Sequence, residues 1–190
     1  MVTKDNIAII IPFHKNVEML RLSIHTLEES IKGEKPQIII IANNNNPNEL
    51  NLPEDEFAQY DIYKIPENLF WPGAINFGAR QTDKEYLLFC DPDIFYTENW
   101  LDNLLDCYNR HKNVGVVSAK IINPLNNRIM DFGMGYNQFN TIHIGKDLPF
   151  NHPTTLDDRK VQAACGAVFL TSHELFKRVN GIDTSMPYIY

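Results

Sequence analysis

The chain has 190 residues, 44% of them hydrophobic, which is enough for one domain with a substantial core. Its 24 acidic and 17 basic residues give a net charge of −7, which argues against binding nucleic acid or an anionic membrane through overall charge. No apolar run approaches the length of about eighteen residues that crosses a membrane, and the N-terminus lacks a secretion-signal pattern. Its 3 cysteines have no C-x-x-C spacing, so we expect reduced residues in a cytoplasmic protein.

The first part of the chain alternates predicted strands and helices. Apolar, β-branched runs at residues 7–11 and 38–41 predict two buried strands. Between them, Asn16 can cap a helix whose apolar side chains recur every three or four residues as far as Ile31. A strand, a helix and a second strand in this order predict a βαβ unit with parallel strands. A short third strand is expected at residues 61–65.

A helix with several small residues is predicted after the third strand. Pro72 suits its first turn, and Gly73 and Gly78 lie within it. Such small residues permit the close approach of either a neighbouring strand or a ligand, and the sequence leaves both open.

The most informative stretch is the apolar run at residues 86–90, which ends at Asp91, Pro92 and Asp93. The run is apolar on both faces, as in a central strand of a sheet that is covered on both sides. Asp91 and Asp93 then lie at the carboxyl end of the strand, where open α/β sheets bind their ligands. Two neighbouring carboxylates favour a divalent cation, Mg²⁺ or Mn²⁺, that also carries phosphate oxygens. A solvated acidic turn is the alternative.

The second half of the chain is less regular. An apolar stripe from Leu101 to Tyr108 predicts a helix, and residues 114–119 predict another buried strand. Residues 123–160 contain glycines, prolines and aromatic residues without a helical period. This composition indicates hairpins, for example around residues 142–144, or a binding region.

Two histidines lie in this irregular region. His143 and His152 have no second ligand at metal spacing, so we expect surface histidines rather than a zinc site. Regular structure is predicted again as a strand at residues 161–170. A helix then begins with a capping-box pattern at residues 171–174 and ends at Gly181.

Together these segments resemble the family 2 inverting glycosyltransferases of the GT-A fold, and the resemblance covers almost the whole chain. It implies an α/β fold with an open, mixed and mainly parallel, Rossmann-like sheet flanked by helices. It also implies a single domain over residues 1–190, with a nucleotide-binding half at about 1–95 and an acceptor-side half at about 96–190. The resemblance is most specific at Asp91-Pro92-Asp93, and it rests on segments that follow one another in the family's order: residues 7–12, 38–46, 73–78, 86–93 and 166–183.

The resemblance implies an enzyme that transfers a hexose or deoxyhexose from a nucleotide-diphosphate sugar to an acceptor hydroxyl with inversion. The reaction would be assisted by Mn²⁺ or Mg²⁺ and would serve polysaccharide or glycoconjugate biosynthesis. The expected partners are the nucleotide-sugar donor and a saccharide or lipid-linked saccharide acceptor, with no nucleic acid. We expect a cytoplasmic protein without a transmembrane segment in this chain, either in solution or peripherally attached to the inner face of the membrane.

The resemblance also assigns roles to individual residues. Asp93 would coordinate the metal, with Asp91 as a second metal-site residue closer to the ribose or the sugar. Where the family has an aspartate that contacts the base, this chain has Ala42 followed by Asn43, so the preferred base is left open. Further contacts to the nucleotide sugar are expected from strand ends, from the glycine-rich helix and from the last predicted strand: Pro12, Phe13, His14, Asn43, Asn44, Gly73, Asn76 and Gly166.

No catalytic base is assigned within this chain. Relatives of the family carry an acidic pair just after the position at which this chain ends, so we expect the general base beyond Tyr190 and a chain that is truncated at its C-terminus. The acceptor would bind to residues 123–160 and to residues beyond Tyr190. Whether the truncated chain is active is therefore open.

Two other functions stay open. One is a domain that binds a nucleotide sugar or a carbohydrate without turnover. The other, less favoured, is a phosphatase with Asp91 as its nucleophile. That motif usually opens a chain and has threonine or valine where Phe95 stands, whereas here two predicted strand and helix units precede it.

Overall fold

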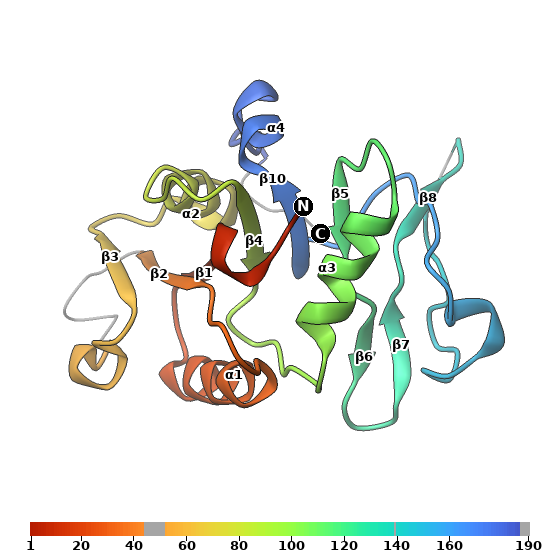
Figure 1. Ribbon diagram of the computed structural model, residues 1–190, viewed down its shortest axis with the longest axis horizontal. Helices are drawn as coiled ribbons and strands as arrows, with labels where there is room; N and C mark the ends of the chain where they lie inside the picture. The colour runs from red at the N-terminus through yellow and green to blue at the C-terminus, as the bar shows by residue number, and fades with distance from the viewer. Residues whose placement is uncertain (44–51, 139, 187–190) are drawn as a thin grey trace.

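The computed structural model describes residues 1–43, 52–138 and 140–186, and it is built around one mixed sheet (Figure 1). The strand order is β3-β2-β1-β4-β10-β5. Neighbouring strands among β1 to β4 pair in parallel, whereas β10 pairs antiparallel with both β4 and β5. The strands are β1 (Ile7–Phe13), β2 (Gln37–Asn43), β3 (Asp61–Ile65), β4 (Tyr86–Cys90), β5 (Val116–Ser118) and β10 (Val168–Ser172).

The described part of the chain contains four α-helices, and they cover the two faces of this sheet. Side chains of α1 (Val17–Ser30) and α3 (Trp100–Arg110) share one buried apolar cluster with residues of the central strands. Side chains of α2 (Phe70–Ala79) and α4 (His173–Arg178) belong to a second cluster. The described residues also form three short 3₁₀ helices: η1 (Lys4–Asn6), η2 (Glu54–Phe57) and η3 (Pro153–Thr155). The predicted α/β fold with a mixed, mainly parallel sheet is therefore confirmed.

The central strands form where the sequence predicts them. Ile9 of β1 pairs with Ile38 on one side and with Leu88 of β4 on the other, so β1 and β4 are both interior strands. Every residue of β1 is buried, which explains its apolar character on both faces. At the start of α1, the side chain of Asn16 accepts a hydrogen bond from the backbone amide of Met19, as expected of a cap.

Gly78 shows why α2 carries small residues. A Cβ atom added at this position would lie 2.5 Å from Cγ2 of Ile10 and 3.1 Å from Cγ1 of Ile41. The glycine therefore permits α2 to pack closely on β1 and β2, which decides between the two interpretations left open for it. The helix begins at Phe70, two residues before Pro72.

Two predicted strands are shorter in the structure. β5 has three residues rather than the six predicted at 114–119, and Val116 is 45% exposed, because β5 lies at the edge of the sheet. The strand predicted at residues 161–170 begins only at Val168. The small, apolar residues 164–167 line a cavity instead of entering the sheet, and Ala163 forms an isolated bridge to Met134. At the start of α4, Ser172 alone provides the side-chain cap by accepting from the amide of Leu175.

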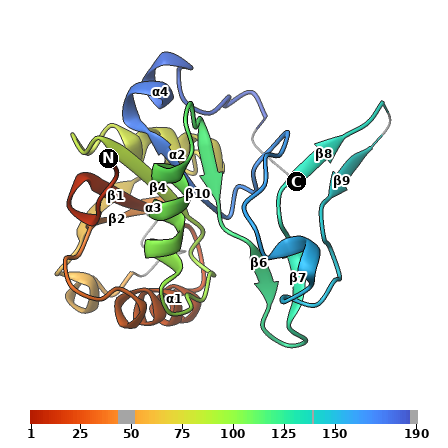
Figure 2. The same ribbon diagram turned by 45° about the vertical axis from the view of Figure 1, so that its right-hand side comes forward.

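Two short β-hairpins form in the region that the sequence predicts to be irregular. The first pairs β6 (Ile121–Asn123) with β7 (Arg128–Asp131), and the second pairs β8 (Met134–Tyr136) with β9 (Thr141–His143). Both lie beside the main sheet rather than in it (Figure 2). The hairpin predicted around residues 142–144 is confirmed. In the described ranges, no helix is both long and apolar enough to span a lipid bilayer.

Candidate active site

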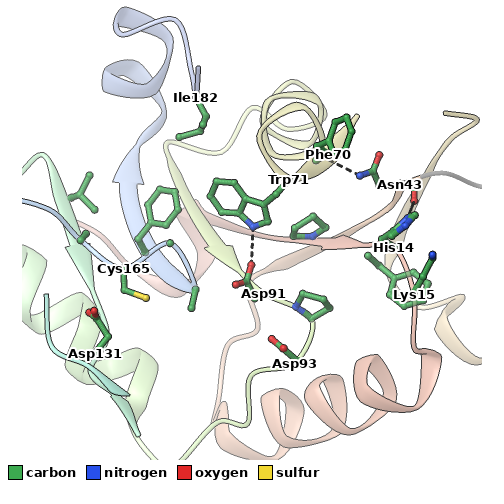
Figure 3. Close-up of a pocket in the computed structure, with 18 of the residues that line it drawn as sticks. His14, Lys15, Asn43, Phe70, Trp71, Asp91, Asp93, Asp131, Cys165 and Ile182 are labelled. Atoms are coloured by element: carbon green, nitrogen blue, oxygen red, sulfur yellow. Dashed lines mark hydrogen bonds between the residues drawn. The ribbon is translucent and has the colours of Figure 1, made fainter. Parts of the chain in front are cut away.

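A cavity of about 1120 Å³ opens at the carboxyl ends of β1, β2 and β4 (Figure 3). Its walls also include the first turn of α2, the segment before β10 and residues of the two hairpins. Parallel strands bring their carboxyl ends to one edge of the sheet, so residues far apart in the chain meet there. Most of the predicted site residues line this cavity: Pro12, Phe13, His14, Asn43, Asp91, Asp93 and Gly166.

Asp91 is the most strongly perturbed acid of the cavity. Trp71, from the first turn of α2, donates a hydrogen bond from Nε1 to Oδ1 of Asp91 at 2.7 Å. Burial raises the pKa of Asp91 to about 6, the Trp71 bond opposes this rise, and the charge of Asp93 adds to it. The backbone amide of Asp91 also donates to the carbonyl of Ala167 at 2.8 Å. The carboxyl group is thus fixed in place in a setting where a nearby positive charge would stabilise its ionised form.

Asp91 and Asp93 suit a hard divalent cation. Among the described residues neither forms an ion pair, and no third aspartate, glutamate, histidine or cysteine joins them at ligand distance. Mg²⁺ and Mn²⁺ prefer oxygen ligands and commonly combine one or two carboxylates with water and phosphate oxygens. The pair could therefore hold such an ion, with its other positions open to a diphosphate and water.

One cluster with potential metal ligands lies outside the cavity. It consists of Cys107 on α3, of His111 directly after that helix and of Asp158 in the segment after η3, and none of the three lines the cavity. The carboxylate of Asp158 already accepts from Arg110 at 2.9 Å and faces Nε2 of His111 at 3.1 Å. These contacts connect the segment after η3 to the end of α3.

The side chain of Asn43 fixes the segment that leads into α2. Its side-chain oxygen accepts from the amide of Leu69 at 2.8 Å, and its nitrogen donates to Asn68 and to the carbonyl of Phe70. Its backbone carbonyl accepts from Nδ1 of His14 at 2.9 Å. Asn43 thus lines the cavity, but its side-chain amide already forms hydrogen bonds within the chain. The expected contact between Asn43 and a nucleobase stays a prediction.

Two of the predicted site residues that the structure describes do not line the cavity, and a third cannot be placed. Asn76 uses its side chain to pair with both backbone groups of Ile182, at 2.7 and 2.8 Å, so it positions the chain after α4. Gly73 lies within α2 and does not line the cavity. Asn44 lies outside the described residues.

A second polar pair in the cavity could not be predicted from the sequence. Asp131, at the end of β7, and His143, at the end of β9, both line it, and Oδ2 of Asp131 lies 2.8 Å from Nδ1 of His143. His143 is exposed, as expected of a surface histidine, but it also lines the cavity and faces Asp131, which the sequence did not indicate. His152 is only partly exposed, lies outside the cavity, and caps η3 by accepting from the amide of Thr154. Trp71, Lys15 and Cys165 are further lining residues that the sequence did not single out.

The sequence matches the model of the family described as Glycosyl transferase family 2 over residues 8–179. The chain belongs to glycosyltransferase family 2. The family that the resemblance implies is thus confirmed.

Two curated relatives of this family 2 chain come from bacterial surface-polymer pathways. It is 27% identical over 124 residues to the minor teichoic acid biosynthesis protein GgaB of Bacillus subtilis (strain 168) and 26% identical over 123 residues to the O-antigen biosynthesis protein RfbC of Myxococcus xanthus. These alignments cover 60% and 62% of the chain, but only 13% and 9% of the respective relatives.

A solved structure shares the fold. The mannosyltransferase PcManGT from Pyrobaculum calidifontis, in complex with GDP-Man and Mn²⁺, superposes with a TM-score of 0.61 at 14% sequence identity. The match covers 96% of this chain and 50% of that structure.

Proposed function

We propose that the chain forms the donor-binding part of a glycosyltransferase that moves a sugar from a nucleotide-diphosphate sugar to an acceptor hydroxyl with inversion. The observation that carries this proposal is the partly buried Asp91 beside the exposed Asp93, at the end of β4 and in the wall of the cavity. The cavity volume of about 1120 Å³ reaches the upper end of the usual range for ligand sites, as a nucleotide sugar requires. GDP-Man and Mn²⁺ in the structural neighbour and the names of the two curated relatives support a donor of this kind and a role in polysaccharide synthesis.

In this proposal Asp91 and Asp93 hold Mn²⁺ or Mg²⁺. The bound ion supplies positive charge that offsets the negative charge on the departing diphosphate. Asp91 must be ionised to act as a ligand, and Trp71 favours that form by donating to Oδ1. Trp71 also fixes the orientation of the carboxylate before any ligand binds, which reduces the cost of ordering it.

The cavity has two sides, separated by the two aspartates. His14, Lys15 and Asn43 lie on one side of Asp91, whereas Asp131 and Cys165 lie on the other (Figure 3). We assign the nucleoside to the first side, where Lys15 can also face the diphosphate, and the sugar to the second. This order places the bond that breaks beside Asp91.

The proposal also assigns the binding and the attack of the acceptor. A hydroxyl of a saccharide or lipid-linked saccharide would attack the anomeric carbon from the face opposite to the diphosphate, in a single displacement that inverts the configuration. We assign acceptor binding to residues 123–160 and the general base to a position beyond Tyr190. Nucleotide sugars are made in the cytoplasm, so the protein would act there, in solution or at the inner face of the membrane.

The test is calorimetric titration of the chain with UDP, GDP, dTDP and CDP, each in Mn²⁺ and again in EDTA. We expect one diphosphate to bind in Mn²⁺ and to lose most of its affinity in EDTA or in the Asp93→Asn variant. Asp106→Asn makes the same chemical change at an exposed residue of α3 and is the matched control, which should bind as the unmodified chain does. Equal binding with and without metal, or no binding at all, would contradict the proposal.

A further inference from the structure

The sugar side of the proposed donor site contains a polar pair that the family resemblance does not assign. Asp131 ends β7 and His143 ends β9, so the two hairpins meet at this pair. Asp131 is only 5% exposed, whereas the side chain of His143 is 43% exposed, and both residues line the cavity. A buried carboxylate needs partners, and here the partners are on its own hairpins.

The loop after β7 is built to hold Asp131 in one orientation. Oδ1 of Asp131 accepts from the backbone amide of Gly133 at 2.7 Å. Gly133 has a φ angle of +88° and would place a Cβ atom 2.5 Å from Cγ1 of Val161, so no larger residue fits this turn. The carbonyl of Gly133 in turn accepts from the amide of Ile144, next to His143.

The arrangement defines where His143 carries its proton. A carboxylate only accepts hydrogen bonds, so the contact of Oδ2 with Nδ1 places the hydrogen of a neutral imidazole on Nδ1. Nε2 then has a free lone pair, and none of the described residues donates to it. His143, a lining residue of the cavity, thus carries an oriented hydrogen-bond acceptor that the described residues leave unused.

We propose that Nε2 of His143 accepts a hydrogen bond from a hydroxyl of the donor sugar, with Asp131 as its positioning residue. This inference rests on the proposed function. A lone pair beside a carboxylate repels a diphosphate but matches a hydroxyl, which is the group that sugars present most often. Asp131 also lies across Asp91 from His14 and Asn43, where we place the nucleoside (Figure 3). His143 would therefore contribute to the choice of sugar and not to the choice of base.

The test separates the sugar from the nucleotide. Affinities for UDP-glucose, UDP-N-acetylglucosamine, GDP-mannose and dTDP-rhamnose are measured in Mn²⁺ by calorimetry, and each is divided by the affinity for the matching nucleoside diphosphate. For a nucleotide sugar that binds, we expect His143→Ala to lower this ratio about tenfold, as for the loss of one hydrogen bond, and to leave diphosphate affinity unchanged. His143→Gln retains an acceptor and should recover part of the ratio. His152→Ala is the control and should change neither affinity.

Each outcome is informative. Binding of diphosphates and nucleotide sugars with the same ratio in His143→Ala would overturn this inference and leave the proposed function intact. Absence of binding by every nucleotide would overturn both. A second readout is independent of any ligand: ¹⁵N NMR of the histidine rings should show a proton on Nδ1 of neutral His143, and a proton on Nε2 instead would contradict the positioning role of Asp131. Asp131→Asn should shift this tautomer balance while diphosphate affinity stays unchanged.

Discussion

A hydrogen bond between Trp71 and Asp91 links α2 to the carboxyl end of β4. The indole at the start of α2 donates it to the carboxylate at 2.7 Å. The bond satisfies the only polar atom of the indole and one oxygen of the acid in the same contact. It also opposes the effect of burial on the pKa of Asp91. The orientation and ionisation of Asp91, which a bound cation would need, therefore depend on Trp71 of α2.

Trp71→Phe should make metal-dependent binding more sensitive to pH. Without the indole donor, the pKa of Asp91 should rise further above about 6, because burial and Asp93 both act in that direction. We expect the affinity for Mn²⁺ with a nucleoside diphosphate to fall several-fold near pH 6.5 and to recover above pH 8, where the acid is ionised in both proteins. Calorimetry from about pH 5.5 to 8.5 measures this. Trp100→Phe, on the far side of the sheet, is the control, and the same pH profile in all three proteins would contradict the prediction.

Asp91→Asn should stabilise the fold at neutral pH. The pKa of Asp91 is raised in the folded chain, so its ionised form opposes folding above about pH 6, and this penalty fades as the pH falls towards 4. An asparagine oxygen can still accept from Trp71. We expect a gain of about 1–3 kcal/mol in the free energy of unfolding at pH 7 and a smaller gain at pH 4.5. Denaturant unfolding at both pH values measures it, with Asp93→Asn at an exposed position as the control. A gain that is equal at both pH values would mean that titration of Asp91 is not its cause.

Asn43→Asp should destabilise the fold at the segment that leads into α2. The side-chain nitrogen of Asn43 donates to Asn68 and to the carbonyl of Phe70, and an aspartate would place an oxygen against both acceptors. The residue is buried, so we expect a loss of about 1–3 kcal/mol in the free energy of unfolding. Asn103→Asp makes the same chemical change at an exposed position of α3. If both variants unfold at the same denaturant concentration, Asn43 does not have this structural role.

Gly78→Ala should destabilise the protein although alanine favours helices. Helix propensity alone predicts a gain of about 1 kcal/mol. The added methyl group would lie 2.5 Å from Ile10, and moving α2 away from β1 should cost about 1–3 kcal/mol, so we expect a net loss. Gly115→Ala is the control, because its Cβ would meet Leu175 at an ordinary 3.6 Å. A higher melting temperature for Gly78→Ala than for the unmodified chain would contradict the packing argument.

The parts of the fold that could be predicted are those in which burial imposes a local pattern. β1, β2 and β4 are covered on both faces, so they appear in the sequence as continuous apolar runs, and the strand-end aspartates follow directly. β5 lies at an edge, and its apolar run extends beyond its pairing. Residues 164–167 are also small and apolar but line the cavity, and no periodicity distinguishes a cavity wall from a strand.

The contacts that complete the site could not be predicted, because they depend on tertiary pairing. Trp71 and Asp91 meet only after α2 packs on the sheet, and Asp131 and His143 meet only through the two hairpins. Asn76 lies in a glycine-rich helix, but its side chain pairs with the backbone of Ile182 and does not line the cavity. The residue types indicated polar chemistry in each case, whereas the partner was set by the fold.

The two tryptophans allow the most direct test of the central claim, that Asp91 and Asp93 hold a divalent cation together with a nucleoside diphosphate. Trp71 Nε1 donates to Asp91, and Trp100 Nε1 donates to Ser30 on the opposite face of the sheet. Mn²⁺ is paramagnetic, so it broadens NMR signals of nearby protons. With a binding diphosphate present, we predict that adding Mn²⁺ abolishes the indole N–H signal of Trp71 and leaves that of Trp100 visible, and that Mg²⁺ abolishes neither. Equal broadening of both signals, or none, would contradict a metal site at Asp91 and Asp93.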